Sequence, residues 1–338
     1  MERKFNRGPA MRDVARAAGV SAQTVSRVLS NHPNVQESTR QRVMAAADEL
    51  DYRRNNMARA LVTGRSKTLG VLTLATNNYS RSSLALGVEL GAREAGYTVN
   101  SVTSGLSAEA LTGAVSRLVN QGVDGIIIAA PLRDAASTVR RLTMRVPTVN
   151  TDGSSGISDG LVGVDQDLAA VLATRHLLEL GHATVWHVAG PEDWSDSAAR
   201  LGSWRRTLEE AGREVPPELH GDWSPESGYR NGLVLGRMPE VTAILVASDE
   251  MAFGVIRALS ELGRRIPEDV SVVGIDDIDL AAYSNPPLTT VRQSFEDTGR
   301  RAVTHLVELI ANPGMDNPPD LAAPVLVVRG STAPPPAA

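Results

Sequence analysis

Polar residues recur in this sequence at the points where short apolar segments end. They are Asn77, Asn78, Asp152, the segment 192–194, Ser248, Asp249, Asp276 and Asp277. If the apolar segments are parallel strands, these residues meet at one edge of a sheet, where open α/β sheets bind ligands. Because Asp and Asn also cap helices and form turns, only the convergence of several such residues indicates a site.

Tryptophans accompany these polar residues. Three of the four lie between positions 186 and 204, and Trp223 follows in the segment GDWSPESG. Carboxylates accept hydrogen bonds from hydroxyl groups, and an indole offers a flat apolar face for stacking. This combination suits a sugar, although an aromatic shelf beside Arg and Asp also suits a purine, and any one tryptophan can instead fill a core.

Signatures of common enzymes and metal sites are missing from the sequence. We find no G-x-x-x-x-G-K phosphate loop, H-E-x-x-H or G-x-G-x-x-G, and the chain has no cysteine. The pattern G-x-S-x-G occurs as GISDG (156–160), but it joins no predicted strand directly to a predicted helix, as a nucleophile elbow would. Its six histidines lack metal-ligand spacing. We therefore expect no catalytic residue, no metal and no cofactor. A glycoside-processing enzyme that uses Asp152 and Asp276 is the enzymatic alternative.

The segments that must position the polar residues alternate between strand and helix patterns from Leu69 onward. Helical patterns such as 168–180 separate them, and three strands are apolar on both faces, as in a parallel sheet covered on both sides. This part is too long for one such domain, so we expect a two-lobed, doubly wound α/β body. The predicted strands are 69–76, 98–103, 125–129, 147–151, 183–190, 243–247 and 271–275.

The first 54 residues predict three short helices around a small core. Gly19 ends the first helix, Ser21 caps the second, and the S-x-x-Q spacing of Ser38–Gln41 indicates a capping box for the third. The outward face of the second helix is polar, through Gln23, Ser26, Arg27 and Ser30. The predicted inward residues are Val14, Ala15, Ala18, Val25, Val28, Leu29, Val43, Ala46, Ala47 and Leu50.

Charge is distributed unevenly along the chain. Residues 1–65 hold twelve Arg or Lys and six Asp or Glu, a charge of +6. Because the whole chain has a net charge of −5, residues 66–338 carry a charge of −11. This asymmetry indicates that the basic head meets a polyanion. Between head and body, residues 57–62 predict a helix too short to be stable alone, so it should form only when something packs on it.

The sequence also bears on the location of the protein and on the order of its C-terminal segment. No run of about 18 apolar residues and no secretory signal occur, so we expect a cytoplasmic protein without a membrane partner. The segment 332–338 has little apolar content and is expected to be a disordered tail.

Several motifs in order resemble the lactose-repressor (LacI/GalR) family of bacterial transcriptional regulators over about residues 10–331. The resemblance implies a small all-α helix-turn-helix head and a two-lobed body of the type I periplasmic-binding-protein kind. The motifs are DVARAAGVSAQTVSRVLSN (13–31), TRQRV (39–43), ELDY (49–52), VAGP (188–191), GDWSPESGY (221–229), VASDEMAFG (246–254), SVVGIDD (271–277) and PPLTTVRQSF (286–295).

The resemblance also implies a domain plan and a mode of action. We expect a repressor that binds a palindromic double-stranded operator as a homodimer and is released by a small sugar or glycoside. A purine-type corepressor and a stand-alone sugar-binding protein are the alternatives. The expected parts are a head (1–54), a hinge helix and linker (55–66), a body (67–331) with an N-lobe (67–163 and 294–322) and a C-lobe (164–293 and 323–331), and the tail.

For DNA, the resemblance implies that the second helix of the head enters the major groove and that the hinge helix reaches the minor groove. Ala22, Gln23 and Arg27 correspond to base-contacting positions, and Leu61 to a minor-groove wedge with Ala58 beside it. The remaining candidate DNA-binding residues are Ser21, Thr24, Ser26, Asn31 and Asn55.

For the effector, the resemblance implies that Asp276 and Arg200 bind ligand hydroxyls and that Trp223 stacks on a sugar face. Asp196 stands where the family has serine and Ser248 where it has asparagine, while Asn78 and Arg81 replace apolar residues. The pocket wall should therefore be more polar than usual. The full candidate set is Asn78, Ser80, Arg81, Leu84, Asp152, Asp196, Arg200, Trp223, Ser248, Asp276, Gln293 and Phe295.

Overall fold

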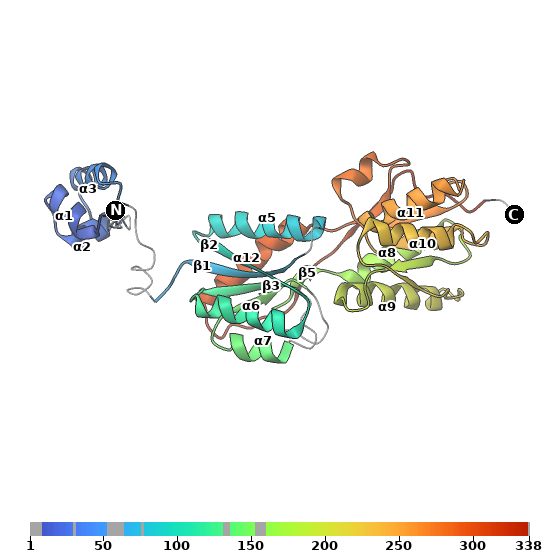
Figure 1. Ribbon diagram of the computed structural model, residues 1–338, viewed down its shortest axis with the longest axis horizontal. Helices are drawn as coiled ribbons and strands as arrows, with labels where there is room; N and C mark the ends of the chain where they lie inside the picture. Colours follow the sequence, from blue (N-terminus) through green and yellow to red (C-terminus); the bar gives the residue numbers. More distant parts are fainter. Residues whose placement is uncertain are drawn as a thin grey trace, which may run out of the picture. The chain divides into compact units, whose positions relative to one another are not determined.

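The computed structural model separates the chain into two units, Met1–Ser66 and Lys67–Ala338 (Figure 1). The described residues are 9–29, 32–52, 64–75, 78–130, 136–152 and 160–336. The predicted hinge helix, with Asn55, Ala58 and Leu61, lies outside these residues, as does Asn31.

The first unit contains the three predicted helices, α1 (Met11–Ala18), α2 (Ala22–Leu29) and α3 (Glu37–Glu49). Gly19 ends α1 in the left-handed conformation, with a φ of 63°. The N–H of Thr24 donates to Ser21 Oγ at 3.1 Å, which confirms Ser21 as the predicted cap. Val14, Val25 and Val43 are fully buried between the helices, so the predicted core is confirmed.

The start of α3 differs from the prediction. The helix begins at Glu37 after Gln36, so Ser38 and Gln41 lie inside it and the predicted capping box is wrong. The Gln36 carbonyl accepts the N–H groups of Thr39 and Arg40, both at 3.0 Å. Val35 packs against the head core, and this contact fixes the chain where it enters the helix.

The first sheet of the second unit is parallel, in the order β2–β1–β3–β4. Ile126 and Ile128 of β3 pack with α6 and α7, whereas Ile127 packs with α5 and α12 on the opposite face. Burial on both faces explains the continuous apolar run GIIIA. The elements are β1 (Thr68–Leu74), α5 (Tyr79–Glu94), β2 (Thr98–Ser104), α6 (Ala108–Asn120), β3 (Gly125–Ala129), α7 (Ala136–Thr143), β4 (Thr148–Asn150) and α12 (Phe295–Ala311) (Figure 1).

The second sheet has the order β12–β10–β9–β8–β6–β7 and is parallel except that β12 runs antiparallel to β10. Helices α8 and α9 contribute to the core on one face, and α10 and α11 to the core on the other. Its elements are α8 (Gln166–Glu179), β6 (Trp186–Ala189), α9 (Ser195–Glu210), β7 (Leu219–His220), α10 (Pro225–Leu235), β8 (Ala243–Val246), α11 (Asp249–Glu261), β9 (Ser271–Asp276), the 3-10 helix η2 (Asp279–Tyr283), β10 (Thr289–Arg292) and β12 (Val325–Val327).

The doubly wound α/β prediction is therefore confirmed, and the seven predicted strands are present with small changes at their ends. Five strands have no counterpart in the prediction: β7, β10, β12 and the parallel pair β5 (Val162–Val164) and β11 (Asp320–Ala322). Each is two to four residues long, too short for a clear period-two pattern.

The predicted disordered tail is wrong for the residues next to the second sheet. Thr332 Oγ1 lies 3.0 Å from His176 Nε2, and the carbonyl of Ala333 accepts from Ser271 Oγ at 2.9 Å. His182 Nε2 lies 3.0 Å from the same carbonyl. Buried polar side chains thus hold the segment, and the lack of apolar residues does not prevent its order.

No helix within the described ranges is long and apolar enough to cross a membrane.

Candidate functional site

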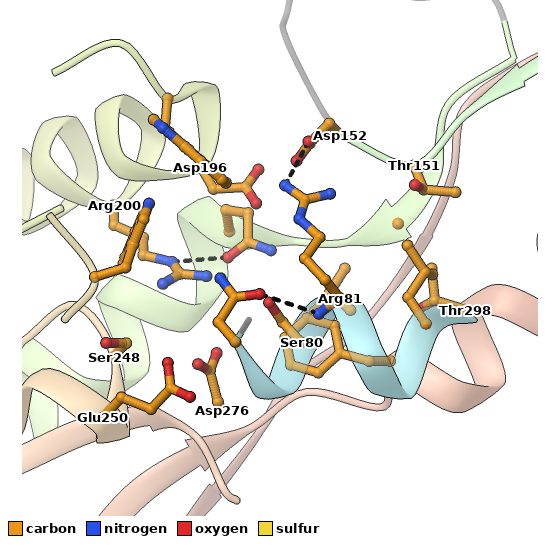
Figure 2. A pocket seen from close by; sticks show the side chains of 18 residues that line it. Ser80, Arg81, Thr151, Asp152, Asp196, Arg200, Ser248, Glu250, Asp276 and Thr298 are labelled. Atoms are coloured by element: carbon orange, nitrogen blue, oxygen red, sulfur yellow. Dashed lines mark hydrogen bonds and ion pairs between the residues drawn. The ribbon is translucent and has the colours of Figure 1, made fainter. Parts of the chain in front are cut away.

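A pocket of the second unit is lined from both of its sheets, by residues such as Asp152, which follows β4, and Asp276, which ends β9 (Figure 2). Eleven of the twelve candidate effector residues line it, and the structure therefore brings them together. They are Asn78, Ser80, Arg81, Leu84, Asp152, Asp196, Arg200, Trp223, Ser248, Asp276 and Phe295.

Gln293 is the candidate that does not line the pocket. Its Nε2 donates to Asp276 Oδ1 at 2.8 Å, and its Oε1 accepts from Gln166 Nε2 at 2.8 Å. Gln166 Oε1 in turn accepts from Arg200 Nε at 2.9 Å. The side-chain amides of Gln166 and Gln293 therefore link Arg200 to Asp276 and hold both side chains in place.

Seven lining residues were missed by sequence reasoning. Thr151 and Glu250 adjoin strand-end positions, Thr298 lies one helical turn after Phe295, and Trp194 falls in the 192–194 segment, so each had a nearby signal. Nothing in the sequence distinguished the other three, which come from β5 and the start of α8. The seven are Thr151, Gly163, Val164, Gln166, Trp194, Glu250 and Thr298.

Two other strand-end carboxylates face away from the pocket and support the fold. Asp249 is fully buried, and its Oδ2 and Oδ1 accept from the Ile278 N–H at 3.0 Å and from Thr290 Oγ1 at 2.6 Å. Asp277 pairs with Arg292 at 2.7 Å and with Arg329 at 2.6 Å. Both residues hold together segments that are far apart in the chain, so neither ligand binding nor the capping and turn alternative describes them.

Arg200 supplies the positive charge of the C-terminal wall. Its side chain extends from α9 and is buried, Nη1 donates to the Ala247 carbonyl, and the guanidinium lies 5.6 Å from the centre of the Trp223 ring. These contacts fix the plane of the guanidinium group, whose five N–H donors exceed the protein partners found for it. Arg200 can therefore offer fixed donors to ligand hydroxyls.

Asp276 supplies the facing carboxylate at the end of β9. Burial raises its pKa well above the usual range; the positive charge of Arg200 opposes this shift, and the negative charges of Asp249 and Glu250 add to it. The φ angles of Trp223, Asp276 and Asp277 are 70°, 123° and 55°, a left-handed range that is costly for residues other than glycine. Such backbone strain is typical of functional sites.

Trp223 provides an aromatic wall. Its ring packs against Gly190, where an added Cβ would lie 2.3 Å from a ring carbon, so this backbone position requires glycine. Trp194 meets it edge-to-face, with ring centres 5.6 Å apart. The indole Nε1 of Trp223 is buried without a protein acceptor, which makes it a donor for a ligand or water. Trp204, by contrast, lies fully in the core.

Arg81 supplies the positive charge of the opposite wall. Nη2 pairs with Asp152 Oδ2 at 2.6 Å, Nη1 donates to the Ala129 carbonyl at 3.0 Å, and Nε is buried without a protein acceptor. Asn78 accepts the N–H of Arg81 at 3.4 Å and thereby caps α5, in addition to lining the pocket. Asn78, Arg81 and Asp152 make this wall of the pocket polar.

Asp196 extends from α9 toward Asp152 and Arg81 (Figure 2). Burial and the nearby negative charge of Asp152 raise the pKa of Asp196 to about 7. Glu250 makes a further contact between the two lobes, because its Oε1 accepts from the N–H of Tyr79 at 3.2 Å. Carboxyl groups thus take part in holding the lobes together.

Stability should respond to pH through Asp196. Since its folded pKa is raised to about 7, its contribution to stability is complete below its ordinary pKa near 3.8 and is lost as pH rises through about 7. We expect Asp196→Asn to unfold at a higher temperature than the wild type at pH 8, with a much smaller difference at pH 5. Equal differences at both pH values in thermal unfolding would contradict this assignment.

The head presents the predicted polar face. Gln23 and Arg27 are exposed on α2, opposite the buried Val25 and Val28. Ser21 Oγ and Thr24 Oγ1 lie 2.9 Å apart at the start of the helix. Side chains with amide and guanidinium groups can reach base edges in a major groove, and hydroxyls can reach phosphates.

No group of three His, Cys, Asp or Glu side chains within the described ranges is arranged to hold a metal ion.

Comparisons with known proteins cover both units. Residues 10–55 match the family described as bacterial regulatory proteins, lacI family, and residues 174–332 match a periplasmic binding protein-like domain. The chain is 32% identical over 334 residues to the ribose operon repressor of Escherichia coli (strain K12), covering 95% of this chain and 99% of that protein. The chain belongs to the LacI family of bacterial regulatory proteins.

Other relatives agree with this assignment. The lactose operon repressor of Escherichia coli (strain K12) is 35% identical over 302 residues, 88% of this chain and 83% of that protein. A crystal structure of the lac repressor dimer bound to operator and the anti-inducer ONPF matches with a TM-score of 0.91 and 33% identity, covering 97% of this chain and 100% of that one. This LacI-family chain is a transcriptional regulator and not an enzyme.

Proposed function

We propose that this LacI-family chain is a cytoplasmic repressor that binds a palindromic operator as a homodimer and leaves it when a sugar or glycoside enters the pocket. The observation that carries the proposal is the pocket itself, in which Arg200, Asp276 and Trp223 face one space between the two lobes. Fixed donors, fixed acceptors and an indole face are what a polyhydroxylated ring requires. The similarity to repressors named for ribose and lactose operons supports the same class of effector.

In this proposal Gln23 and Arg27, with Ala22 beside them, contact base edges, while hydroxyl and amide groups around α2 position the head on phosphates. Two heads on one palindrome follow the two-fold symmetry that such operators share with a dimer. The phosphate-contacting residues are Ser21, Thr24, Ser26 and Asn31, and Asn55, Ala58 and Leu61 contact the operator from the hinge.

In the pocket, Arg200 and Asp276 bind hydroxyls, and Trp223 stacks on the ring. Gln293 acts by holding Asp276, since it donates to that carboxylate from outside the pocket. The other proposed effector contacts are Asn78, Ser80, Arg81, Leu84, Asp152, Asp196, Ser248 and Phe295.

The direct test uses the purified full chain and palindromic DNA from near its own gene. We expect binding that weakens steeply as salt rises, because phosphate contacts release counterions, and release of DNA when the correct sugar is added. Binding to no palindrome, or binding without salt dependence, would contradict the proposal.

A thermal-shift screen of sugars against purines separates inducer from corepressor classes. A ligand at 100 times its Kd stabilises the folded state by about 2.7 kcal/mol, which is readily detected. Stabilisation by a purine, together with tighter operator binding, would instead establish the purine-type regulator.

Leu61→Ala should separate DNA binding from effector binding. Loss of an apolar wedge from the minor groove removes the contact that favours bent DNA, so we expect operator affinity to fall at least about tenfold. Effector affinity, measured by calorimetry, should not change. Leu106→Ala is the matched control, because Leu106 is an exposed leucine of the body. Equal loss of both affinities in Leu61→Ala would refute the role given to the hinge.

A further inference from the structure

A second cavity adjoins the pocket on the side of β5 and the start of α9. Thr151, Gly163, Val164, Gln166 and Asp196 line both spaces, so the two cavities lie next to each other. The pocket between the lobes has about 60 Å³ of free volume, and the second cavity has about 670 Å³. The second cavity, called the side chamber, is therefore the roomier of the two, and it opens to solvent beside Leu321, which is 46% exposed.

The walls of the side chamber combine apolar surface with hydrogen-bonding groups. Leu161 and Leu321 contribute the apolar part, and Ser195 lies at the start of α9. The N-cap residue of α9, Trp194, makes no side-chain cap, so the first N–H groups of this helix receive no capping side-chain acceptor. Hydroxyl groups of a ligand could accept from such N–H groups.

Charge in the two spaces disfavours an anionic ligand. The side chamber is lined by Asp165, Asp167 and Asp196 and by Arg206, which already pairs with Asp167 at 2.9 Å. In the inner pocket, Arg81 is neutralised by Asp152 at 2.6 Å, and Arg200 faces Asp276. Two of these three guanidinium groups are therefore already paired with carboxylates, and a phosphate or carboxylate on the ligand would have to compete for them.

We propose that the effector is a neutral di- or oligosaccharide that occupies both spaces. One sugar unit lies against Trp223, Arg200 and Asp276, and the next unit passes Asp196 into the side chamber. Alternating apolar and hydroxyl-bearing surfaces of a sugar chain match the leucines and polar groups of that chamber. This inference rests on the proposed function, because it names the class of effector for the same pocket.

The experiment compares ligand size in the wild type and in variants that fill the side chamber. Calorimetric titrations use a panel of neutral disaccharides, their constituent monosaccharides and the matching sugar phosphates. Ala198 on α9 and Leu321 on β11 line only the side chamber, so Ala198→Trp and Leu321→Trp fill it from two different elements. Ala198→Ser is the matched control, since it adds a single small atom.

We expect one disaccharide to bind the wild type at least about tenfold more tightly than either of its monosaccharides, and sugar phosphates not to bind. Each tryptophan variant should lose at least about tenfold in disaccharide affinity and keep its monosaccharide affinity, with Ala198→Ser unchanged. If one variant fails to fold, the other provides the same comparison.

Two results would overturn the inference in different ways. Monosaccharides that bind as tightly as disaccharides, or tryptophan variants that bind disaccharides normally, would refute the side chamber and leave the sugar-responsive repressor intact. Binding of no saccharide by a protein that still binds operator would refute the sugar effector itself.

Discussion

Arg200→Met is expected to remove the response to effector and leave operator binding intact. Arg200 is 4% exposed, and its guanidinium donates to Gln166 at 2.9 Å and faces Asp276. A hydrogen bond from a charged donor to a ligand is worth about 1.5–3 kcal/mol, and the Arg200 guanidinium can donate more than one. We therefore expect effector affinity to fall at least about 30-fold, and operator DNA to remain bound at effector concentrations that release the wild type.

The fold should survive this substitution. Methionine approximates the volume of the arginine stem, and Asp276 can remain protonated because burial already raises its pKa well above the usual range. Arg205→Met is the matched control on the same helix, because Arg205 is half-exposed and pairs with Glu218 at 3.1 Å near the surface. An Arg200→Met protein that binds effector normally would show that Arg200 serves the fold alone.

Gly254→Ala should destabilise the second lobe more than any surface change. Helices α10 and α11 pack so closely that a Cβ at Gly254 would lie 1.9 Å from the Pro225 carbonyl oxygen and 2.5 Å from the Tyr229 nitrogen. At Gly228 on α10, a Cβ would lie 2.0 Å from the Met251 carbonyl oxygen. Backbone atoms cannot rotate away, so the helices must separate, at a cost of about 3 kcal/mol or more.

Urea denaturation followed by tryptophan fluorescence measures this effect, since all four tryptophans lie between residues 186 and 223. Gly113→Ala is the matched control, because nothing lies within 4 Å of an added Cβ there in α6. It should be neutral or stabilising by about 0.5–1 kcal/mol. Similar midpoints for Gly254→Ala and the wild type would mean that α10 and α11 can separate without cost.

Several parts of the structure followed from the sequence because they depend on local patterns. Apolar runs such as GIIIA and AILVA indicate strands buried on both faces, and they form β3 and β8. The head helices followed from the spacing of apolar residues within each helix, such as Val25, Val28 and Leu29 in α2. The pocket residues came from strand ends and from motif resemblance, which do not require coordinates.

Contacts between distant segments required the tertiary structure. Hydrogen bonds link Arg200 through Gln166 and Gln293 to Asp276. One of these bonds, between Gln166 and Gln293, joins residues that are 127 positions apart in the chain. The contact of Glu250 with Tyr79 spans 171 positions. No local periodicity encodes such partners, because they depend on how the chain crosses between the lobes.

The sequence by itself determined the basic head, the doubly wound body and the polar residues at the strand ends. The tertiary structure decided which of those residues face the ligand: Asp276 does, whereas Asp249 and Asp277 anchor the fold. It also decided that Thr332 and Ala333 are held by buried polar groups and that a side chamber adjoins the pocket. The physical reason is that burial patterns repeat along one element, while hydrogen-bond partners and cavities are set by the approach of elements far apart in the chain.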